Sequence, residues 1–208
     1  MGCARVTNYL PLLAAAVGGY LLGSIPFGVI ATRLGGAGDI TKLGSGNIGA
    51  TNVLRTGRKD LAALTLIGDV GKGIVAVVLA WFLTHDPAVV AVAGGAAFLG
   101  HLFPVWLRFK GGKGVATFFG VLLFSAPPVG LAAAATWIAM AFLFRISSLA
   151  ALTAAALAPV YALLFDQPYA YVWLALFMGV LIFVRHRANI QRLLNGQEPK
   201  IGAGKKKD

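Results

Sequence analysis

The sequence predicts an all-α integral membrane protein, and its composition and hydrophobic pattern support this class. Hydrophobic residues make up 58% of the 208 residues and charged residues only 12%, whereas soluble domains carry about 25% charged residues. Lipid leaves no partner for a free backbone group, so long apolar segments are expected to form membrane-spanning helices. The single cysteine, Cys3, excludes an internal disulfide framework and a cysteine-rich metal cluster.

Seven apolar segments are expected to cross the membrane. The first is too long for a cleaved signal peptide and contains Pro26. The fourth covers only ~18 Å as a helix, against a ~30 Å hydrocarbon core, and a Pro-Pro pair ends it, so it is either a short span or re-entrant. The segments are residues 10–32, 61–83, 88–107, 115–126, 129–144, 149–165 and 169–184.

The basic residues orient these helices. With the N-terminus in the periplasm and the C-terminus in the cytoplasm, sixteen of the eighteen Lys and Arg residues face the cytoplasm. The net charge of +11 lies in short clusters between apolar segments, which indicates membrane orientation and no nucleic-acid partner. We expect one membrane domain over residues 1–198 and a basic, unfolded tail over residues 199–208, attracted to anionic lipid.

The first polar segment, residues 42–55, is rich in glycine and neutral polar residues at the predicted membrane edge. Glycines expose backbone N–H groups and permit turns closed to other residues. The planar guanidinium of an arginine suits phosphate. An ordinary interhelical loop would not combine so many glycines and amides with so few charges. The candidate binding residues are Ser45, Asn47, Thr51, Asn52 and Arg55.

The second polar segment, residues 100–117, places a Gly-Gly-Lys-Gly sequence directly before the fourth apolar segment. If that segment is a helix, its free N–H groups and positive dipole end face this loop. A nucleotide P-loop is not expected, because Leu107 stands where its first glycine belongs and a glycine follows the lysine. The alternatives are a tight basic turn or a phosphate cradle. The cradle residues would be Gly111, Gly112, Lys113, Gly114 and Thr117, and His101 is either a packing residue or a further substrate ligand.

The third polar segment, residues 185–196, follows the last apolar segment. If the last helix continues through it, His186 and Asn189 are three residues apart and share a face. Histidine can exchange a proton near neutral pH, and asparagine can donate a hydrogen bond to an oxyanion. We expect these two side chains to be functional, and Arg187 and Arg192 to contact lipid headgroups.

One pair of charges lies inside the second apolar segment. Asp69 and Lys72 are three residues apart and therefore share a helix face. Intramembrane charges are costly unless they are paired or face a polar cavity. The pair either neutralises itself or has a function, and Lys72 is a candidate substrate ligand.

Taken together, these segments resemble the bacterial acyl-phosphate:glycerol-3-phosphate acyltransferase family, PlsY. The resemblance covers nearly the whole chain, and its motifs are long and in order. One departure is Gly71, where the family pattern leads us to expect a bulkier apolar residue. The matching segments are GSIPFG (23–28), GSGNIGATNVLR (44–55), the Asp69/Lys72 pair, GHLFPVWLRFKGGKGVAT (100–117), and RHRANIQRLLNG (185–196) with Glu198.

The resemblance implies transfer of a fatty acyl group from acyl phosphate to the 1-hydroxyl of sn-glycerol 3-phosphate. The products would be lysophosphatidic acid and inorganic phosphate, in the first step of phospholipid synthesis. It implies no cofactor, no metal and no nucleotide, and a functional monomer in the bacterial inner membrane with its active site facing the cytoplasm. Two glycine-rich anion sites at the membrane surface suit two phosphate-bearing substrates, one of which has a long acyl tail.

We expect Lys113 and its glycine loop, with Thr117, to hold the phosphate of the acyl donor. Ser45, Asn47 and Arg55 would hold glycerol 3-phosphate, while His186 and Asn189 would position the phosphate or the attacking hydroxyl. The proton acceptor is either His186 or a substrate phosphate oxygen. A covalent acyl-Ser45 intermediate is a third mechanism, although no plausible base lies beside Ser45 in the sequence.

Two other function classes compete with the enzyme. A transporter for a small phosphorylated anion would explain the basic loops and the Asp69/Lys72 pair. It predicts polar residues across the membrane and an inverted repeat, yet the outer halves of the segments are Ala, Val, Leu and Phe, and no repeat is seen. A non-catalytic membrane scaffold would leave the three polar segments unexplained.

Overall fold

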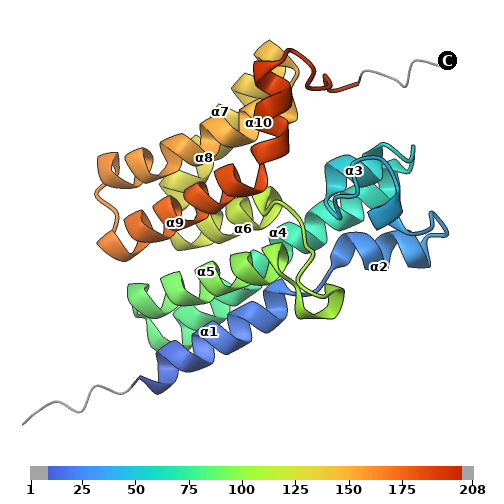
Figure 1. Cartoon of the computed structure of the whole chain (residues 1–208). Helices are drawn as coiled ribbons and strands as arrows, with labels where there is room; N and C mark the ends of the chain where they lie inside the picture. The colour runs from blue at the N-terminus through green and yellow to red at the C-terminus, as the bar shows by residue number, and fades with distance from the viewer. Residues whose placement is uncertain (1–8, 203–208) are drawn as a thin grey trace, which may run out of the picture.

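The structure, a computed structural model, describes residues 9–202, and every regular element in that range is a helix (Figure 1). Cys3, Arg5 and the lysines of residues 205–207 lie outside the described residues. The elements are α1 (Leu10–Gly23), α2 (Phe27–Leu34), η1 (Ile40–Lys42), α3 (Ala50–Leu54), α4 (Lys59–Thr84), α5 (Pro87–Leu102), η2 (Val105–Leu107), α6 (Val115–Ser125), α7 (Pro127–Phe144), α8 (Ser147–Leu164), α9 (Tyr169–Arg185) and α10 (Arg187–Leu194).

Five helical segments in the described range are long and apolar enough to cross a membrane, or six if α9 and α10 form one bent span. The first of these, Leu10–Leu34, is divided into α1 and α2 at Pro26, which has no N–H to continue the helix. Helix α6 has 11 residues, so it covers only ~16 Å. The all-helical membrane class is confirmed, and the count of seven crossings and their orientation stay predictions.

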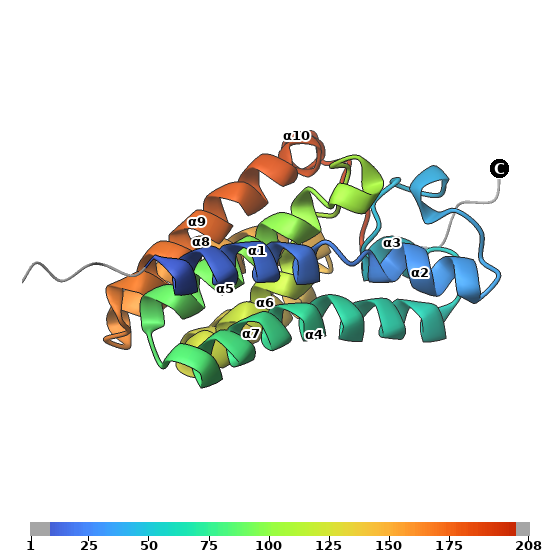
Figure 2. The same cartoon turned by 90° about the horizontal axis from the view of Figure 1, so that it is seen from below.

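The polar connections gather at one end of the helical bundle. The α2–α3 arm, the α5–α6 loop and α10 lie at this end, and the α4–α5 and α8–α9 turns lie at the other (Figures 1 and 2). Arg145, in the α7–α8 turn, also lies at the polar end, where its carbonyl accepts a hydrogen bond from the Ile201 N–H at 2.6 Å. The basic clusters that the sequence assigns to one side of the membrane are therefore at one end of the molecule.

Small residues allow the helices at the centre of the bundle to approach closely. A Cβ added to Gly23 in α1 would stand 1.9 Å from the carbonyl oxygen of Ala97 in α5. A Cβ on Gly120 in α6 would stand 2.1 Å from the carbonyl oxygen of Val70 in α4. Without a hydrophobic force between helices in lipid, such close backbone packing stabilises the bundle. It also fixes the start of α6, and with it the Gly-Gly-Lys-Gly loop.

Candidate active site

Asn52 shapes the first polar loop from inside. Its Oδ1 accepts a hydrogen bond from the Ser45 N–H at 2.9 Å, and its Nδ2 donates to the carbonyls of Leu43 and Asn47 at 2.9 and 2.8 Å. The side chain is buried, and a weaker contact of 3.3 Å reaches the Ile40 carbonyl. Asn52 therefore holds the loop in shape, and its polar atoms are occupied before any substrate arrives.

Three of the other residues predicted to bind substrate in this loop are exposed. Ser45, Thr51 and Arg55 are exposed, and Asn47 is half-buried. The Oδ1 atom of Asn47 is buried without a hydrogen-bond partner among the described residues. A loop that exposes two hydroxyls and a guanidinium can bind a polyol phosphate.

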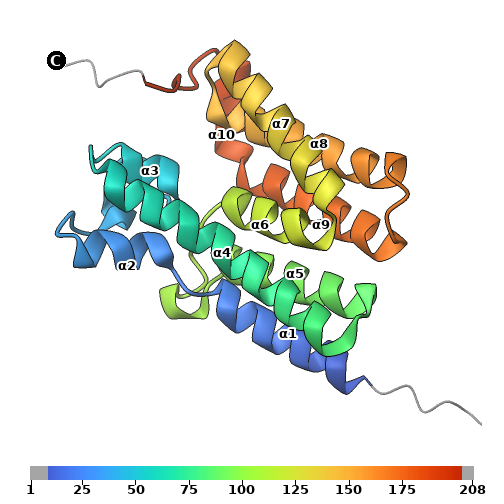
Figure 3. The ribbon, with the colours of Figure 1, turned by 180° about the vertical axis from the view of Figure 1, so that it is seen from behind.

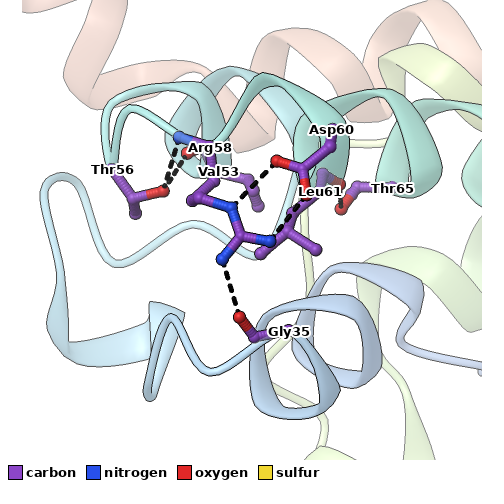
Figure 4. Close-up of polar contacts among 7 residues, drawn as sticks. All are labelled: Gly35, Val53, Thr56, Arg58, Asp60, Leu61 and Thr65. Carbon is purple, nitrogen blue, oxygen red and sulfur yellow. Dashed lines mark hydrogen bonds and ion pairs between the residues drawn. The ribbon is translucent and has the colours of Figure 1, made fainter.

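A clamp at the start of α4 ties this loop to α2 (Figure 4). The Arg58 guanidinium donates from Nε and Nη2 to the Asp60 carboxylate at 2.9 and 2.6 Å, and from Nη1 to the Gly35 carbonyl at 2.8 Å. The Thr56 hydroxyl donates to the Val53 carbonyl at 2.7 Å. These contacts close the segment between α2 and α4 that carries the polar loop. Because the ion pair is exposed, we expect it to contribute little to overall stability.

The Gly-Gly-Lys-Gly loop is closed by its own backbone and by Arg185. The N–H groups of Gly111 and Gly112 donate to the carbonyls of Leu102 and His101, each at 3.1 Å. Arg185 donates from Nη2 to the Gly111 carbonyl at 2.7 Å and from Nε to the Gly112 carbonyl at 3.1 Å. These two N–H groups are thus used inside the protein. The N–H groups left for an anion are those at the start of α6.

Helix α6 begins where the sequence predicts a helix, directly after the loop. Gly114 is its N-cap residue and has φ +86°, a conformation that favours glycine. Thr117, predicted as a phosphate ligand, is fully buried, and its hydroxyl donates to the Asp69 carbonyl at 2.9 Å. That hydrogen bond joins α6 to α4 behind the loop.

Lys113 points from the loop to α10, where its ammonium donates to Asn189 Oδ1. The pKa of Lys113 is lowered to about 8, mainly by burial and also by the positive charges of Arg192, Arg55 and Arg185, while the charge of Glu198 opposes the shift. The effect of Arg55 places the α3 arm within electrostatic range of this lysine. The structure therefore brings Lys113 of the second predicted segment into contact with Asn189 of the third, and the charge of Arg55 from the first segment acts on this lysine.

Asn189 is oriented by Glu198. The Glu198 Oε1 atom accepts hydrogen bonds from Asn189 Nδ2 at 2.6 Å and from the Ser148 hydroxyl at 2.8 Å, and Oε2 accepts one from Arg192 at 2.7 Å. Burial raises the pKa of the carboxyl, but these three hydrogen bonds outweigh burial and hold the pKa below its usual range. Arg192, expected to contact lipid headgroups, instead forms an ion pair with Glu198.

His186 lies at a bend that the sequence pattern does not predict. Helix α9 ends at Arg185, and α10 leaves at 64° to it, so the expected continuous helix through this segment is wrong. His186 and Asn189 are nevertheless both buried. His186 Nδ1 lies 2.8 Å from the Ile182 carbonyl, which can only accept, so Nδ1 carries the proton and Nε2 is left as an acceptor.

Several further residues support the site. The loop is held by Arg185, and Asn189 is held by Glu198, which Ser148 supports. The sequence had predicted no role for these three residues. Arg185 and Glu198 at least lie within or beside a predicted motif, whereas nothing local marks Ser148.

Lys72 and His101, predicted as substrate ligands, are buried with Asp69 behind the Gly-Gly-Lys-Gly loop. Within residues 9–202, no three His, Cys, Asp or Glu side chains gather in a way that could hold a metal ion.

The arrangement collects positive charge and amide groups at one polar end of a lipid-embedded bundle. Lys113 and the start of α6 can hold a phosphate, and Asn189 can stabilise an oxyanion beside them. His186 Nε2 can accept a proton or a hydrogen bond from a hydroxyl. Such a site suits group transfer between a lipid-soluble molecule and a soluble phosphate.

Comparison with known proteins supports the same chemistry. The family model described as glycerol-3-phosphate acyltransferase matches residues 13–196. A glycerol-3-phosphate acyltransferase from Caulobacter vibrioides (strain NA1000 / CB15N) is 76% identical over 198 residues, which are 95% of this chain and 91% of the relative. One from Maricaulis maris (strain MCS10) is 61% identical over 204 residues, covering 98% of this chain and 93% of the relative.

Solved structures agree with this assignment. The crystal structure of PlsY (YgiH), an integral membrane glycerol 3-phosphate acyltransferase, in its glycerol 3-phosphate form has a TM-score of 0.87 and 39% identity, covering 92% of this chain and 96% of that chain. The lysophosphatidic acid form of PlsY (YgiH) gives a TM-score of 0.84 and 37% identity, covering 92% and 95% of the two chains. The chain therefore belongs to the glycerol-3-phosphate acyltransferase family of integral membrane proteins, PlsY.

Proposed function

We propose that this acyltransferase uses a fatty acyl phosphate as its donor and acylates the 1-hydroxyl of glycerol 3-phosphate, releasing lysophosphatidic acid and inorganic phosphate. The observation that carries the proposal is the position of Lys113, between the start of α6 and Asn189 of α10. A phosphate bound there would lie beside a hydrogen-bond donor for an oxyanion and beside His186. Glycerol 3-phosphate, held by the loop of residues 42–55, would then meet an acyl donor whose leaving group is phosphate.

In the proposed reaction, the glycerol hydroxyl oxygen attacks the acyl carbonyl carbon. The bond from that carbon to the phosphate oxygen then breaks, and Lys113 stabilises the charge on the leaving phosphate. Ser45, Asn47, Thr51 and Arg55 hold the phosphate and hydroxyls of glycerol 3-phosphate. Acyl phosphates are mixed anhydrides with a good leaving group, so positioning and charge stabilisation supply most of the rate.

The proton of the attacking hydroxyl goes either to His186 Nε2 or to a phosphate oxygen of the substrate. The Ile182 carbonyl holds the proton on Nδ1, so Nε2 is an acceptor suited to orient the hydroxyl in both cases. A His186→Ala variant measured across pH separates the two routes. Substantial residual activity with an unchanged pH profile would favour the phosphate oxygen, and loss of the acidic limb of the profile would favour histidine. Trapping with radiolabelled acyl phosphate tests the covalent acyl-Ser45 route.

The donor is tested with purified protein in detergent. Phosphate release from palmitoyl phosphate should require glycerol 3-phosphate, and palmitoyl-CoA should not replace the acyl phosphate. Lys113→Ala should abolish turnover, while the matched control Lys110→Ala, an exposed residue of the same loop, should retain it. Turnover with palmitoyl-CoA alone would contradict the donor assignment. Phosphate flux in liposomes without acyl transfer would favour a transporter.

We further propose that the polar end of the bundle faces the cytoplasm of a bacterial inner membrane, as the positive-inside rule indicates. The single native cysteine provides the test. A membrane-impermeant maleimide should label Cys3 in intact spheroplasts. In a Cys3→Ser background, a cysteine at Arg145 should be labelled only after lysis. Labelling of the Arg145→Cys variant in intact spheroplasts would reverse the orientation.

A further inference from the structure

We propose that Asp69, Lys72 and His101 form a buried positioning centre that sets the two candidate phosphate-binding loops relative to each other. These residues are buried where α4 meets the end of α5, and none of them is more than 4% exposed. The inference rests on the proposed function, because it assigns the centre an effect on the two substrates of that reaction. It gives Lys72 and His101 a role through the loops and no direct contact with substrate.

The centre is held together by the charge of Asp69. Its Oδ1 lies 2.7 Å from Lys72 Nζ and 3.4 Å from His101 Nδ1. Lys72 and Asp69 come from the same helix, α4, whereas His101 comes from α5. Buried in a low-dielectric surrounding, the carboxylate and ammonium are stable only as a pair, so neither can move without the other.

One arm of the centre reaches the Gly-Gly-Lys-Gly loop. His101 Nδ1 is turned toward Asp69, at 3.4 Å and without a hydrogen-bond partner among the described residues, while Nε2 faces the loop. A Cβ on Gly112 would stand 2.1 Å from that Nε2 atom, so the imidazole lies directly against the Gly112 backbone. The His101 carbonyl accepts from the Gly112 N–H at 3.1 Å. His101 therefore supports the residue that precedes Lys113 with both its ring and its backbone.

A second contact in this arm fixes the start of α6. The carbonyl of Asp69 accepts a hydrogen bond from the Thr117 hydroxyl at 2.9 Å, in the first turn of α6. The loop between His101 and Thr117 is thus attached to the centre on both sides. Figure 3 shows α4 leaving the α2–α3 arm and passing beside α6.

The other arm reaches the glycerol 3-phosphate loop through α2. Lys72 Nζ donates to the Ile25 carbonyl at 3.0 Å, in the break between α1 and α2. Ile25 precedes Pro26, and its carbonyl also accepts a short-range hydrogen bond from the Phe27 N–H at 3.2 Å. Lys72 therefore stabilises the break at which α2 begins. Helix α2 in turn leads into the segment that contains Ser45 and Arg55. One ion pair is connected to both loops.

The experiment compares KM for the two substrates in single variants. Lys72→Met should raise KM for glycerol 3-phosphate at least fivefold and change KM for the acyl phosphate less. His101→Ala should raise KM for the acyl phosphate at least fivefold and change KM for glycerol 3-phosphate less. His101→Gln, which keeps an N–H donor, should bring KM for the acyl phosphate to within threefold of the wild type. Asp69→Asn should raise both values. The matched control is Thr65→Val in the same helix, because within residues 9–202 the Thr65 hydroxyl bonds only to the Leu61 carbonyl one turn away. Both KM values of this control should stay within twofold of the wild type.

Loss of folding is separated from loss of positioning by two further measurements. Melting temperature in detergent shows whether each variant is folded, and a lower active fraction alone would reduce kcat without raising KM. The double variant Asp69→Asn/Lys72→Met leaves no unpaired buried charge, so it provides a folded form that still lacks the centre. An active double variant with both KM values within twofold of the wild type would overturn the inference.

Failure of the donor assignment would look different, since the wild type itself would not turn over acyl phosphate. Calorimetric binding of glycerol 3-phosphate needs no acyl donor and tests the α2 arm separately. The expected result is at least fivefold weaker binding by Lys72→Met than by Thr65→Val. Equal binding by these two variants would overturn the role of Lys72.

Discussion

Raising the pH through about 8 should remove the positive charge of Lys113 and reduce acyl transfer. Burial is the main cause that brings the pKa of this lysine down from 10.5 to about 8; the cations Arg192, Arg55 and Arg185 contribute to this shift and Glu198 opposes it. A lowered lysine pKa means that the charge is present below about pH 8 and lost above it. For one ionisation, the protonated fraction falls about tenfold between about pH 7 and pH 9.

The assay is the pH dependence of kcat/KM for the acyl phosphate, with a blank for spontaneous hydrolysis at each pH. This parameter reports the ionisation of the free enzyme, so its alkaline limb should have an apparent pKa of about 8. The diagnostic variant is Lys113→Arg, whose guanidinium stays protonated throughout the range. Its rate at neutral pH should be lower because the Asn189 contact is altered, but its alkaline limb should disappear.

Two results would refute this reasoning. A wild-type profile that is flat to about pH 10 would mean that Lys113 keeps an ordinary lysine pKa or that its charge is not needed. An alkaline limb that survives unchanged in Lys113→Arg would assign the limb to another group. Lys110→Arg, in the exposed part of the same loop, is the matched control and should keep the wild-type profile.

Two further substitutions test the supports of the site. Glu198→Ala removes the acceptor that orients Asn189; the Glu198 side chain is only 6% exposed. Loss of one hydrogen bond to a charged group costs about 1.5–3 kcal/mol and should lower kcat/KM about 10- to 150-fold. The neighbouring control Gln197→Ala should change kcat/KM less than twofold, and equal effects of the two substitutions would contradict the role of the carboxylate. Gly112→Ala places a Cβ 2.1 Å from the His101 ring and should lower kcat/KM at least tenfold, whereas Gly71→Ala, with no heavy atom within 4 Å, should keep activity and a melting temperature at or above the wild type. A fully active Gly112→Ala enzyme would show that the loop can shift without consequence.

Hydropathy and charge predict most of the fold because lipid allows few alternatives. Each long apolar segment had to become a helix, and the basic clusters had to gather at one end. The bend at His186 could not be predicted in this way, since no proline or glycine marks it and the apolar pattern simply stops there. The break at Pro26 was visible as a proline, but its use as an acceptor for Lys72 depends on how α4 packs against α1 and α2.

The candidate site divides in the same way between local and long-range information. Lys113 and the helix start at Val115 were predictable, because a glycine loop before an apolar segment has a local physical meaning. The bonding of Asn52 to its own loop was not, since an amide in a polar loop can face inward or outward with the same sequence pattern. Ser148 meets Glu198 across 50 residues, a contact that only the packing of α8 beside the end of the chain creates.

The hydrogen bond of Lys113 also indicates how binding and catalysis are linked. Its ammonium is held by the neutral amide oxygen of Asn189, which Glu198 keeps turned toward it. An arriving phosphate is a stronger, charged acceptor and would replace that oxygen as the partner of Lys113. Its charge would favour the protonated lysine, so the alkaline limb of kcat should lie at higher pH than the limb of kcat/KM. Glu198 would still hold one N–H of Asn189 Nδ2, leaving the other N–H to donate to the oxyanion. Coincident limbs for the two parameters would show that the phosphate does not bind at Lys113.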